Sequence, residues 1–211
     1  DRCTALSGAS CAVARSGLFL RWGFADGSLR ACAVRAPAAT PAHLWEQLHG
    51  GQPIVACCVS ADGRTLGTAD AMGTVSVWRG AVRPASMVLR GQLRGHRAPV
   101  RCLACSGAQQ LLVSAAADGL LLLWDTRLLA LLHAIRFGPS LVGVAGSTPP
   151  PQAEVVGLCV REETSETLVL TPQQLQLWSV NGSLLAVSNE TFPAATSLLA
   201  APAPEWMAEQ L

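Results

Sequence analysis

The 211-residue chain contains no lysine and no tyrosine, so all fifteen of its basic residues are arginine. Isoleucine and asparagine occur only twice each. These residues have AT-rich codons, and we attribute their scarcity to genome composition rather than to selection for guanidinium chemistry. Charged residues make up 14% of the chain and the net charge is +1. This balance excludes a strongly basic nucleic-acid-binding domain.

Long hydrophobic runs are also missing. The most apolar stretch, residues 111–135, contains Asp118, Asp125 and Arg127 and falls short of the roughly 20 consecutive apolar residues of a membrane span. The chain opens on Asp1 without the methionine, basic segment and apolar segment of a secretory signal. We therefore expect no transmembrane segment, a cytoplasmic location, and a chain that is an excerpt from a longer protein.

Hydrophobic residues make up 50% of the chain, which is enough for one sizeable core and excludes intrinsic disorder. The eight cysteines lack the regular spacing of a disulfide framework, so we expect thiols in a reducing compartment. Cys102 and Cys105 form a CxxC pair, but no second pair follows at the spacing that a zinc site needs. We therefore expect no metal and no cofactor.

The sequence repeats with a period of 46 residues. Two sets of residues follow this period: Gly27, Gly73 and Gly119, and, five positions later, Cys32, Trp78 and Trp124. A looser fourth copy ends at Trp178. We expect one repeat to end near each of Cys32, Trp78, Trp124 and Trp178, and residues 194–211 to form a truncated fifth repeat.

Within one period, short apolar runs alternate with Gly, Asp, Pro and Ser, a pattern typical of strands joined by turns. Asp118-Gly119 lies between two such runs and predicts a tight hairpin, because both residues tolerate the backbone angles of the turn. A helix is the competing interpretation for residues 127–134, but that segment lies where a strand should leave the repeat. Four strands in a period of about 40–45 residues describe a β-propeller blade.

The third repeat carries the residues of a known family. Gly95-His96 opens it, Asp118 lies in its turn and Trp124-Asp125 closes it, and together they resemble the WD-repeat pattern. The resemblance implies an all-β, WD-repeat β-propeller. The chain length would supply about four to five blades of a ring of about seven, so we expect a partial propeller.

The resemblance also assigns four residues of this repeat to a hydrogen-bonded chain: His96, Ser114, Asp118 and Trp124. Inside a blade these groups satisfy one another, and an unsatisfied buried polar group costs stability. Ser, His and Asp together also suggest a hydrolase, but a hydrolase needs an exposed nucleophile and an oxyanion hole. Because the serine falls inside a predicted strand, we expect a structural role and no catalytic residue.

The other repeats depart from this pattern. Repeat two has Gly50 where the histidine should stand, with His49 one residue away. It has Met72 where the aspartate should stand and Thr68 in place of the serine. We therefore expect repeat two to depend on apolar packing instead of the polar chain.

Three segments, residues 22–30, 93–100 and 177–186, resemble the C-terminal propeller of BEACH-domain proteins. These are very large cytoplasmic scaffolds of vesicle trafficking, lysosome biology and selective autophagy. The resemblance implies a non-catalytic platform for protein partners, with endolysosomal or autophagic membranes as candidate locations. A WD-repeat adaptor of another assembly, such as a ubiquitin-ligase substrate receptor, is the first alternative. A propeller-shaped enzyme is the second, and the four scattered histidines speak against it.

The small net charge hides an asymmetry. Residues 71–117 contain six arginines and no acid, whereas residues 150–211 contain one arginine and seven glutamates. In the family, the loop bearing Gly95-His96 lies on the top face of the propeller, so Arg94 and Arg97 are candidate contacts for an acidic peptide or a lipid headgroup. A solvated loop is the alternative. We expect no nucleic-acid binding, because no aromatic residues interleave with the arginines.

Overall fold

The computed structural model describes residues 13–16, 19–23, 27–33, 43–45, 48–80, 87–136, 155–172 and 174–188. Every regular element in these ranges is a β-strand, and the sixteen strands form four antiparallel sheets of four. The predicted all-β propeller fold is therefore confirmed. Within the same ranges, no helix has the length and hydropathy needed to cross a bilayer.

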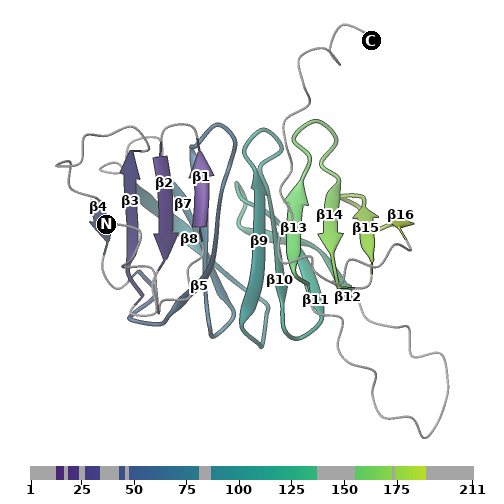
Figure 1. Ribbon diagram of the computed structural model, residues 1–211, viewed down its shortest axis with the longest axis horizontal. Helices are drawn as coiled ribbons and strands as arrows, with labels where there is room; N and C mark the ends of the chain where they lie inside the picture. Colours follow the sequence, from purple (N-terminus) through teal and green to yellow (C-terminus); the bar gives the residue numbers. More distant parts are fainter. Residues whose placement is uncertain are drawn as a thin grey trace, which may run out of the picture.

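Each sheet is a meander of consecutive strands and forms one blade (Figure 1). Blades 1 and 2 consist of β1 (Val13–Ser16), β2 (Phe19–Gly23), β3 (Leu29–Ala33), β4 (His43–Trp45), β5 (Ile54–Val59), β6 (Thr65–Asp70), β7 (Thr74–Arg79) and β8 (Val88–Arg94). Blades 3 and 4 consist of β9 (Val100–Ser106), β10 (Leu111–Ala116), β11 (Leu120–Asp125), β12 (Ala130–Arg136), β13 (Gly157–Val160), β14 (Thr167–Leu170), β15 (Leu175–Trp178) and β16 (Leu184–Ser188). The Leu-rich segment for which a helix competed is a turn followed by β12.

The third strand of each blade contains one of the four residues at which a repeat was expected to end, namely Cys32, Trp78, Trp124 and Trp178. The side chain of Cys32 lies outside the described part of the structure, and so does the whole of the expected truncated repeat at 194–211.

The first strands of successive blades are neighbours: β1 contacts β5, β5 contacts β9, and β9 contacts β13. Because the chain reverses at every strand, the loops that lead into blades 2 and 3 lie at the same end as the turns after their second strands. We call this end the His-loop face; it carries loops 48–53 and 95–99 and turns 71–73 and 117–119. The opposite face carries turns such as 61–64 and 107–110. The His-loop face points down in Figure 1.

The hydrophobic core lies between blades. Strands β6 and β10 are buried over all six of their residues, because both faces of each sheet are covered by a neighbouring blade. The layer between blades 2 and 3 includes Val75, Val77 and Leu93 on one side and Leu103, Leu112 and Leu122 on the other. The layer between blades 3 and 4 includes Val113, Leu121 and Leu123 on one side and Leu158, Val160 and Val169 on the other. Burial on both faces explains why β10 is apolar except for Ser114. Strand β6 is buried as well but contains polar residues, of which Thr68 and Asp70 are hydrogen-bonded to His49.

The 46-residue glycine spacing has a steric cause at the His-loop face. Gly27 and Gly73 have φ angles of +77° and +89°, which favour glycine. A Cβ atom on Gly27 would lie 2.7 Å from the carbonyl oxygen of Gln52, and one on Gly73 would lie 2.8 Å from that of His96. Each glycine turn therefore packs directly against the loop that leads into the next blade.

A different contact joins blades 2 and 3 near the opposite face. Leu129, in the β11–β12 turn, has a φ of +55°, a left-handed conformation that costs a bulky residue about 1–2 kcal/mol. Its Cδ1 occupies the space where a Cβ of Gly91 on β8 would stand. Blade 4 reverses the sizes: its turn has Gly182, which faces His133 and Ile135 on β12. At each junction a large side chain meets a glycine.

We predict that Gly91→Val lowers the free energy of unfolding by about 1–3 kcal/mol, because the added side chain overlaps Leu129. Adding Leu129→Gly should recover part of this loss, because the double variant reproduces the arrangement of blade 4. Urea denaturation of the wild type, both single variants and the double variant measures the coupling, which we expect to exceed about 0.5 kcal/mol. Strict additivity of the two single effects would contradict the contact.

Candidate functional site

The structure brings together the four residues predicted to form a polar chain in blade 3. Trp124 on β11 donates its indole N–H to Ser114 Oγ on β10 at 2.8 Å. Ser114 Oγ lies 2.8 Å from His96 Nε2, in the loop that leads into the blade. His96 Nδ1 lies 3.4 Å from Asp118 Oδ2, in the β10–β11 turn. The chain therefore links the loop, two strands and the turn of one blade.

The proton positions in this chain follow from burial. Burial lowers the pKa of His96 below its usual 6.5, and the Asp118 carboxylate offsets this only in part. A neutral imidazole accepts the Ser114 hydroxyl at Nε2 and directs Nδ1–H toward Asp118, so the donors run from Trp124 to the carboxylate. The last contact is not a well-aligned hydrogen bond. The same carboxylate also accepts the backbone N–H groups of Arg97 at 3.1 Å and Leu120 at 3.0 Å.

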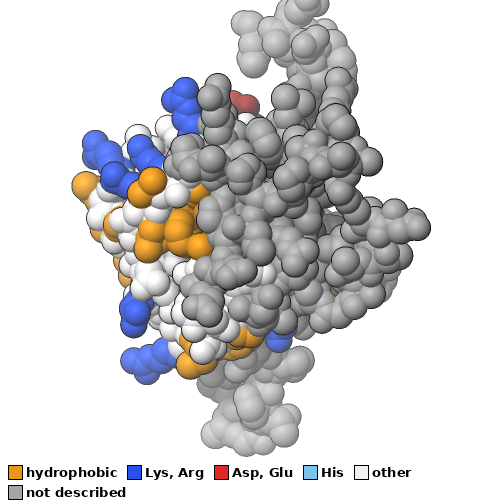
Figure 2. Space-filling model, turned by 90° about the vertical axis from the view of Figure 1, so that its left-hand side faces the viewer, with side chains coloured by type: hydrophobic (Ala, Val, Ile, Leu, Met, Phe, Trp, Pro, Cys, Tyr) orange, Lys and Arg blue, Asp and Glu red, His pale blue; other side chains and the backbone are white. Residues whose placement is uncertain are grey.

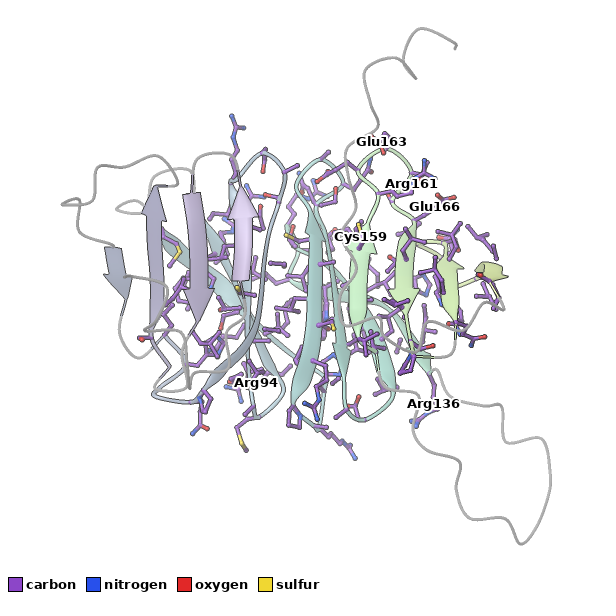
Figure 3. All side chains as sticks on the ribbon, in the orientation of Figure 1. Arg94, Arg136, Cys159, Arg161, Glu163 and Glu166 are labelled. Carbon is purple, nitrogen blue, oxygen red and sulfur yellow. The ribbon has the colours of Figure 1, made fainter. Side chains whose placement is uncertain are left out.

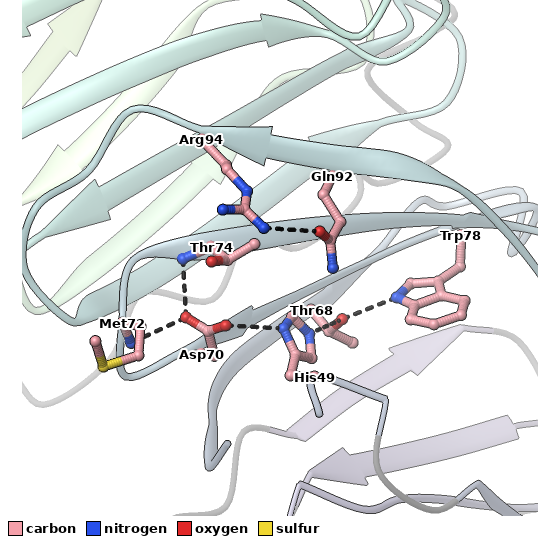
Figure 4. A network of polar contacts seen from close by, with 8 residues as sticks. All are labelled: His49, Thr68, Asp70, Met72, Thr74, Trp78, Gln92 and Arg94. Carbon is pink, nitrogen blue, oxygen red and sulfur yellow. Dashed lines mark hydrogen bonds and ion pairs between the residues drawn. The ribbon is translucent and has the colours of Figure 1, made fainter. Parts of the chain in front are cut away.

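Blade 2 contains a complete polar chain of its own (Figure 4). Trp78 donates its indole N–H to Thr68 Oγ1 at 2.8 Å. His49 Nε2 lies 2.8 Å from Thr68 Oγ1, and His49 Nδ1 lies 3.1 Å from Asp70 Oδ2. Burial lowers the pKa of His49 as well, against the opposing effect of Asp70. The expectation that repeat two depends on apolar packing instead of this chain is therefore wrong.

The residues of this chain do not all stand 46 positions before those of blade 3, so the repeat period alone does not reveal them. Asp70 is the last residue of β6 rather than a turn residue, and its Oδ1 accepts the backbone N–H groups of Met72 at 2.9 Å and Thr74 at 2.8 Å. Its carboxylate thus spans the turn from the strand end and still reaches the histidine, while Met72 points outward and is 68% exposed. The detectable signal was the ten-residue spacing of Thr68 and Trp78, which equals that of Ser114 and Trp124.

In blade 4 the tryptophan N–H has a different hydrogen-bond partner. Trp178 donates its indole N–H to Gln176 Oε1 at 2.9 Å, and both residues lie on β15. This contact keeps the tryptophan N–H satisfied without joining the strand to an inter-blade loop.

In blades 2 and 3 the order hydroxyl, imidazole, carboxylate matches that of a hydrolytic triad, but the environment does not. Thr68 and Ser114 are both 0% exposed, and each hydroxyl oxygen already accepts a tryptophan N–H. A nucleophile must reach its substrate and needs an oxyanion hole beside it. The two hydroxyl oxygens are closed to any substrate. The polar chains can therefore stabilise the blades, but their hydroxyl groups cannot act as nucleophiles.

The CxxC pair does not converge on one site, because residues three apart on a strand face opposite ways. Cys102 Sγ donates to the carbonyl oxygen of Val155, on the side of blade 4, at 3.6 Å. Cys105 packs on the side of blade 2, where hydrogen bonding to Cys58 and burial raise its pKa well above the usual 9.0. A thiol held in its neutral form is a poor metal ligand. In the described ranges, no three His, Cys, Asp or Glu side chains are arranged to hold a metal ion.

Arg94, labelled in Figure 3, and Arg97 lie on the His-loop face, and both are exposed. Arg94 ends β8 and its Nη2 donates to Gln92 Oε1 at 3.4 Å, whereas Arg97 is held through its backbone N–H by Asp118. Met72 protrudes from the adjacent turn, because Gly73 packs against the carbonyls of this loop. We call Met72, Arg94 and Arg97 the Arg94–Arg97 surface. It offers two cations and one apolar side chain at the junction of blades 2 and 3.

We predict that Asp70→Ala and Asp118→Ala each lower the free energy of unfolding by about 1–3 kcal/mol. Asp70→Ala leaves the buried His49 N–H without its partner, and Asp118→Ala removes the carboxylate that faces His96 and accepts the backbone N–H groups of Arg97 and Leu120. Asp70→Ala should cost more, since the contact of Asp70 with its histidine is shorter than that of Asp118. Urea denaturation measures both effects, with Glu163→Ala, at an exposed position, as the control. Equal stability of the wild type and both variants would exclude a stabilising polar chain.

Stability should also fall on acidification. His49 and His96 have folded-state pKa values below 6.5, so below about pH 6.5 the unfolded chain binds protons that the folded chain does not. The free energy of unfolding is then highest above pH 6.5 and decreases as the pH falls toward the folded-state values. Urea midpoints at pH 7.5, 6.5 and 5.5 measure this decrease. The double variant His49→Gln/His96→Gln should be less stable at pH 7.5 but show a shallower decrease, and an equally steep one would refute the assignment.

Comparison with known proteins agrees with this geometry. The family described as WD domain, G-beta repeat matches residues 87–125, from the end of blade 2 through the third strand of blade 3. BEACH domain-containing protein A2 of Arabidopsis thaliana is 32% identical over 87% of this chain and 5% of its own length. Protein SPIRRIG of the same plant is 30% identical over 92% of this chain and 5% of its own length. The chain thus spans about 5% of the length of these curated relatives.

A chain in the crystal structure of the mitotic checkpoint complex superposes on this one with a TM-score of 0.65. The superposition covers 84% of this chain and 49% of that chain at 14% sequence identity, a level at which the likeness concerns the fold alone. The four-stranded blades, the polar chains within them and the matched repeat show that this chain has a WD-repeat β-propeller fold, and over most of its length it is similar to a segment of BEACH domain-containing proteins.

Proposed function

We propose that this chain is a non-catalytic platform that binds protein partners through the loops of its His-loop face. The observation that carries the proposal is the Arg94–Arg97 surface, where Arg97 lies on a loop held by a polar chain and Arg94 ends the strand just before that loop. A loop fixed in this way presents its side chains with little loss of conformational entropy on binding. Exposed, positioned arginines at such a site are typical of binding surfaces.

The charge of this surface favours an acidic peptide as the partner. The nearest carboxylates, Asp70 and Asp118, are engaged by the histidines and backbone N–H groups of the two polar chains. Their charges are therefore directed inward, and the arginine side chains remain available to an external anion. Arginine binds carboxylates in a two-pronged geometry, which suits glutamate and aspartate side chains. A lipid headgroup is the alternative anion.

The relatives support a role within a large scaffold. We infer that the chain serves a BEACH-type protein of vesicle trafficking, lysosomal function or selective autophagy, in the cytoplasm and at endolysosomal or autophagic membranes. The similarity to BEACH domain-containing protein A2 over 87% of the chain favours this role over that of a ubiquitin-ligase substrate receptor. The sequence encoded before Asp1 tests the choice: a BEACH domain there supports it, and an F-box-like module contradicts it.

We predict that Arg94→Glu/Arg97→Glu weakens the binding of a fluorescein-labelled, glutamate-rich peptide by about fivefold or more, because two attractive contacts become repulsive. Fluorescence anisotropy at low and moderate salt measures the affinity, which should fall as salt rises. The matched control is Arg64→Glu/Arg161→Glu, which changes two exposed arginines of the opposite face.

Both double variants should unfold at nearly the wild-type temperature, since all four side chains are exposed and the one ion pair that the control breaks, Arg161–Glu166, lies on the surface. Equal peptide affinity of the two variants would overturn the proposed site. Binding of vesicles that contain phosphatidylserine, lost in Arg94→Glu/Arg97→Glu while the peptide fails to bind at all, would establish the lipid alternative.

A further inference from the structure

A second exposed surface lies on the outer edge of the junction between blades 2 and 3, near the opposite face. Val88 and Leu89, at the start of β8, are 63% and 43% exposed, and Leu128, in the β11–β12 turn, is 65% exposed. The turn lies beside β8, because Leu129 fills the space over Gly91. We call Val88, Leu89 and Leu128, with the exposed Arg90 and Arg127, the edge patch.

The turn that presents Leu128 has a fixed backbone. Asp125 Oδ1 accepts the backbone N–H of Arg127 at 2.7 Å and that of Leu128 at 2.8 Å. Leu129 follows in the left-handed conformation and is packed against blade 2. Leu128 is therefore held away from the core by the backbone of the turn. An apolar side chain here is not a requirement of the fold, because the equivalent turn of blade 4 exposes Asn181 and Ser183.

The charges around these apolar side chains are predominantly positive. Arg90 and Arg127 make no ion pair in the described part of the chain. Arg79 pairs with Val88 in the β7–β8 ladder and adds a third cation, against the two carboxylates of Asp62 and Asp125. Figure 2, which looks onto the side of blades 1 and 2, shows hydrophobic side chains and arginines close together on the described surface. An anionic partner complements this surface.

We propose that the edge patch is a peripheral contact surface for an anionic lipid bilayer. Val88, Leu89 and Leu128 would enter the boundary between headgroups and acyl chains, and the arginines would bind lipid phosphates and carboxylates. Interfacial membrane binding combines apolar side chains with nearby cations in this way. The apolar side chains protrude from a strand edge and a turn, a shape that a deformable bilayer accommodates.

The position of the edge patch makes this contact compatible with the proposed function. Val88 and Leu89 lie at the start of β8, whereas Arg94 ends the same strand on the His-loop face. A bilayer against the edge patch therefore leaves the Arg94–Arg97 surface open to a protein partner. The proposal does not depend on the acidic-peptide site and is tested separately from it.

Flotation of the 211-residue chain with lipid vesicles tests the proposal. Vesicles of phosphatidylcholine with one part in five phosphatidylserine are compared with vesicles of phosphatidylcholine alone. The test variant is Val88→Thr/Leu128→Gln, which removes protruding apolar groups without touching an arginine. The matched control is Leu184→Gln/Leu185→Gln on the outer strand of blade 4, whose two leucines are 47% and 50% exposed on a strand without arginine. Circular dichroism melts verify that both variants fold.

We expect the chain to float with the anionic vesicles and much less with the neutral ones. The Val88→Thr/Leu128→Gln variant should reduce the bound fraction at least threefold, Arg90→Glu/Arg127→Glu should reduce it further, and the blade 4 control should bind as the wild type does. Unchanged binding of the test variant, or equal loss in the control, would overturn the proposal. Loss of vesicle binding in Arg94→Glu/Arg97→Glu alone would assign the lipid to the His-loop face instead. A concentration-dependent dimer without vesicle binding, abolished in the test variant, would identify a second copy as the occupant.

Discussion

The contact between a buried histidine and the hydroxyl of the following blade fixes the geometry of this molecule at both junctions where it occurs. His49 and His96 each stand in the loop that leads into a blade, and each is attached to the second strand of that blade by a 2.8 Å contact. The glycine turns of the preceding blades pack against the same loops. One interaction therefore closes a blade internally and aligns it with its predecessor. The loop that contains the exposed Arg97 is therefore held in place by the same polar chain.

The two polar chains also explain how such an apolar molecule retains a specific arrangement of blades. Apolar layers between sheets are not directional and tolerate small sliding movements. A chain of hydrogen bonds between an indole, a hydroxyl, an imidazole and a carboxylate is directional, and it is satisfied in one geometry only. Hydrolytic triads have the same order of hydroxyl, imidazole and carboxylate, because the same groups can hydrogen-bond in series. Here that series is buried away from solvent. Because these polar chains are buried, only side chains on the surface can contact a partner.

The fold was largely predictable from the sequence, because glycine recurs in the turns with positive φ angles and tryptophan recurs on the third strand of three of the four blades. The polar chain of blade 3 was also predictable, since its residues stand at the usual separations. The chain of blade 2 was not, because Asp70 acts from the end of a strand and His49 lies one residue further from its hydroxyl partner than His96 does. The side chains of Asp70 and His49 are long enough to make the same contacts from these shifted positions. A comparison at a fixed 46-residue offset does not take the length of the side chains into account. The exposure of Leu128 was equally hidden, because a Leu-rich segment does not reveal which of its residues occupies the turn.

The exchange of sizes between Leu129 with Gly91 and Gly182 with Ile135 has a consequence for how repeats of this kind evolve. Blades with similar sequences are often regarded as interchangeable units that duplication and recombination can reorder. Here the turn of blade 3 places Leu129 over a strand with a glycine, whereas the outer strand of blade 3 has His133 and Ile135 and faces a turn with a glycine. A copy of blade 3 placed beside itself would set Leu129 against Ile135. Neighbouring blades must therefore change together, and the order of the blades is constrained by pairs of residues that no single repeat reveals.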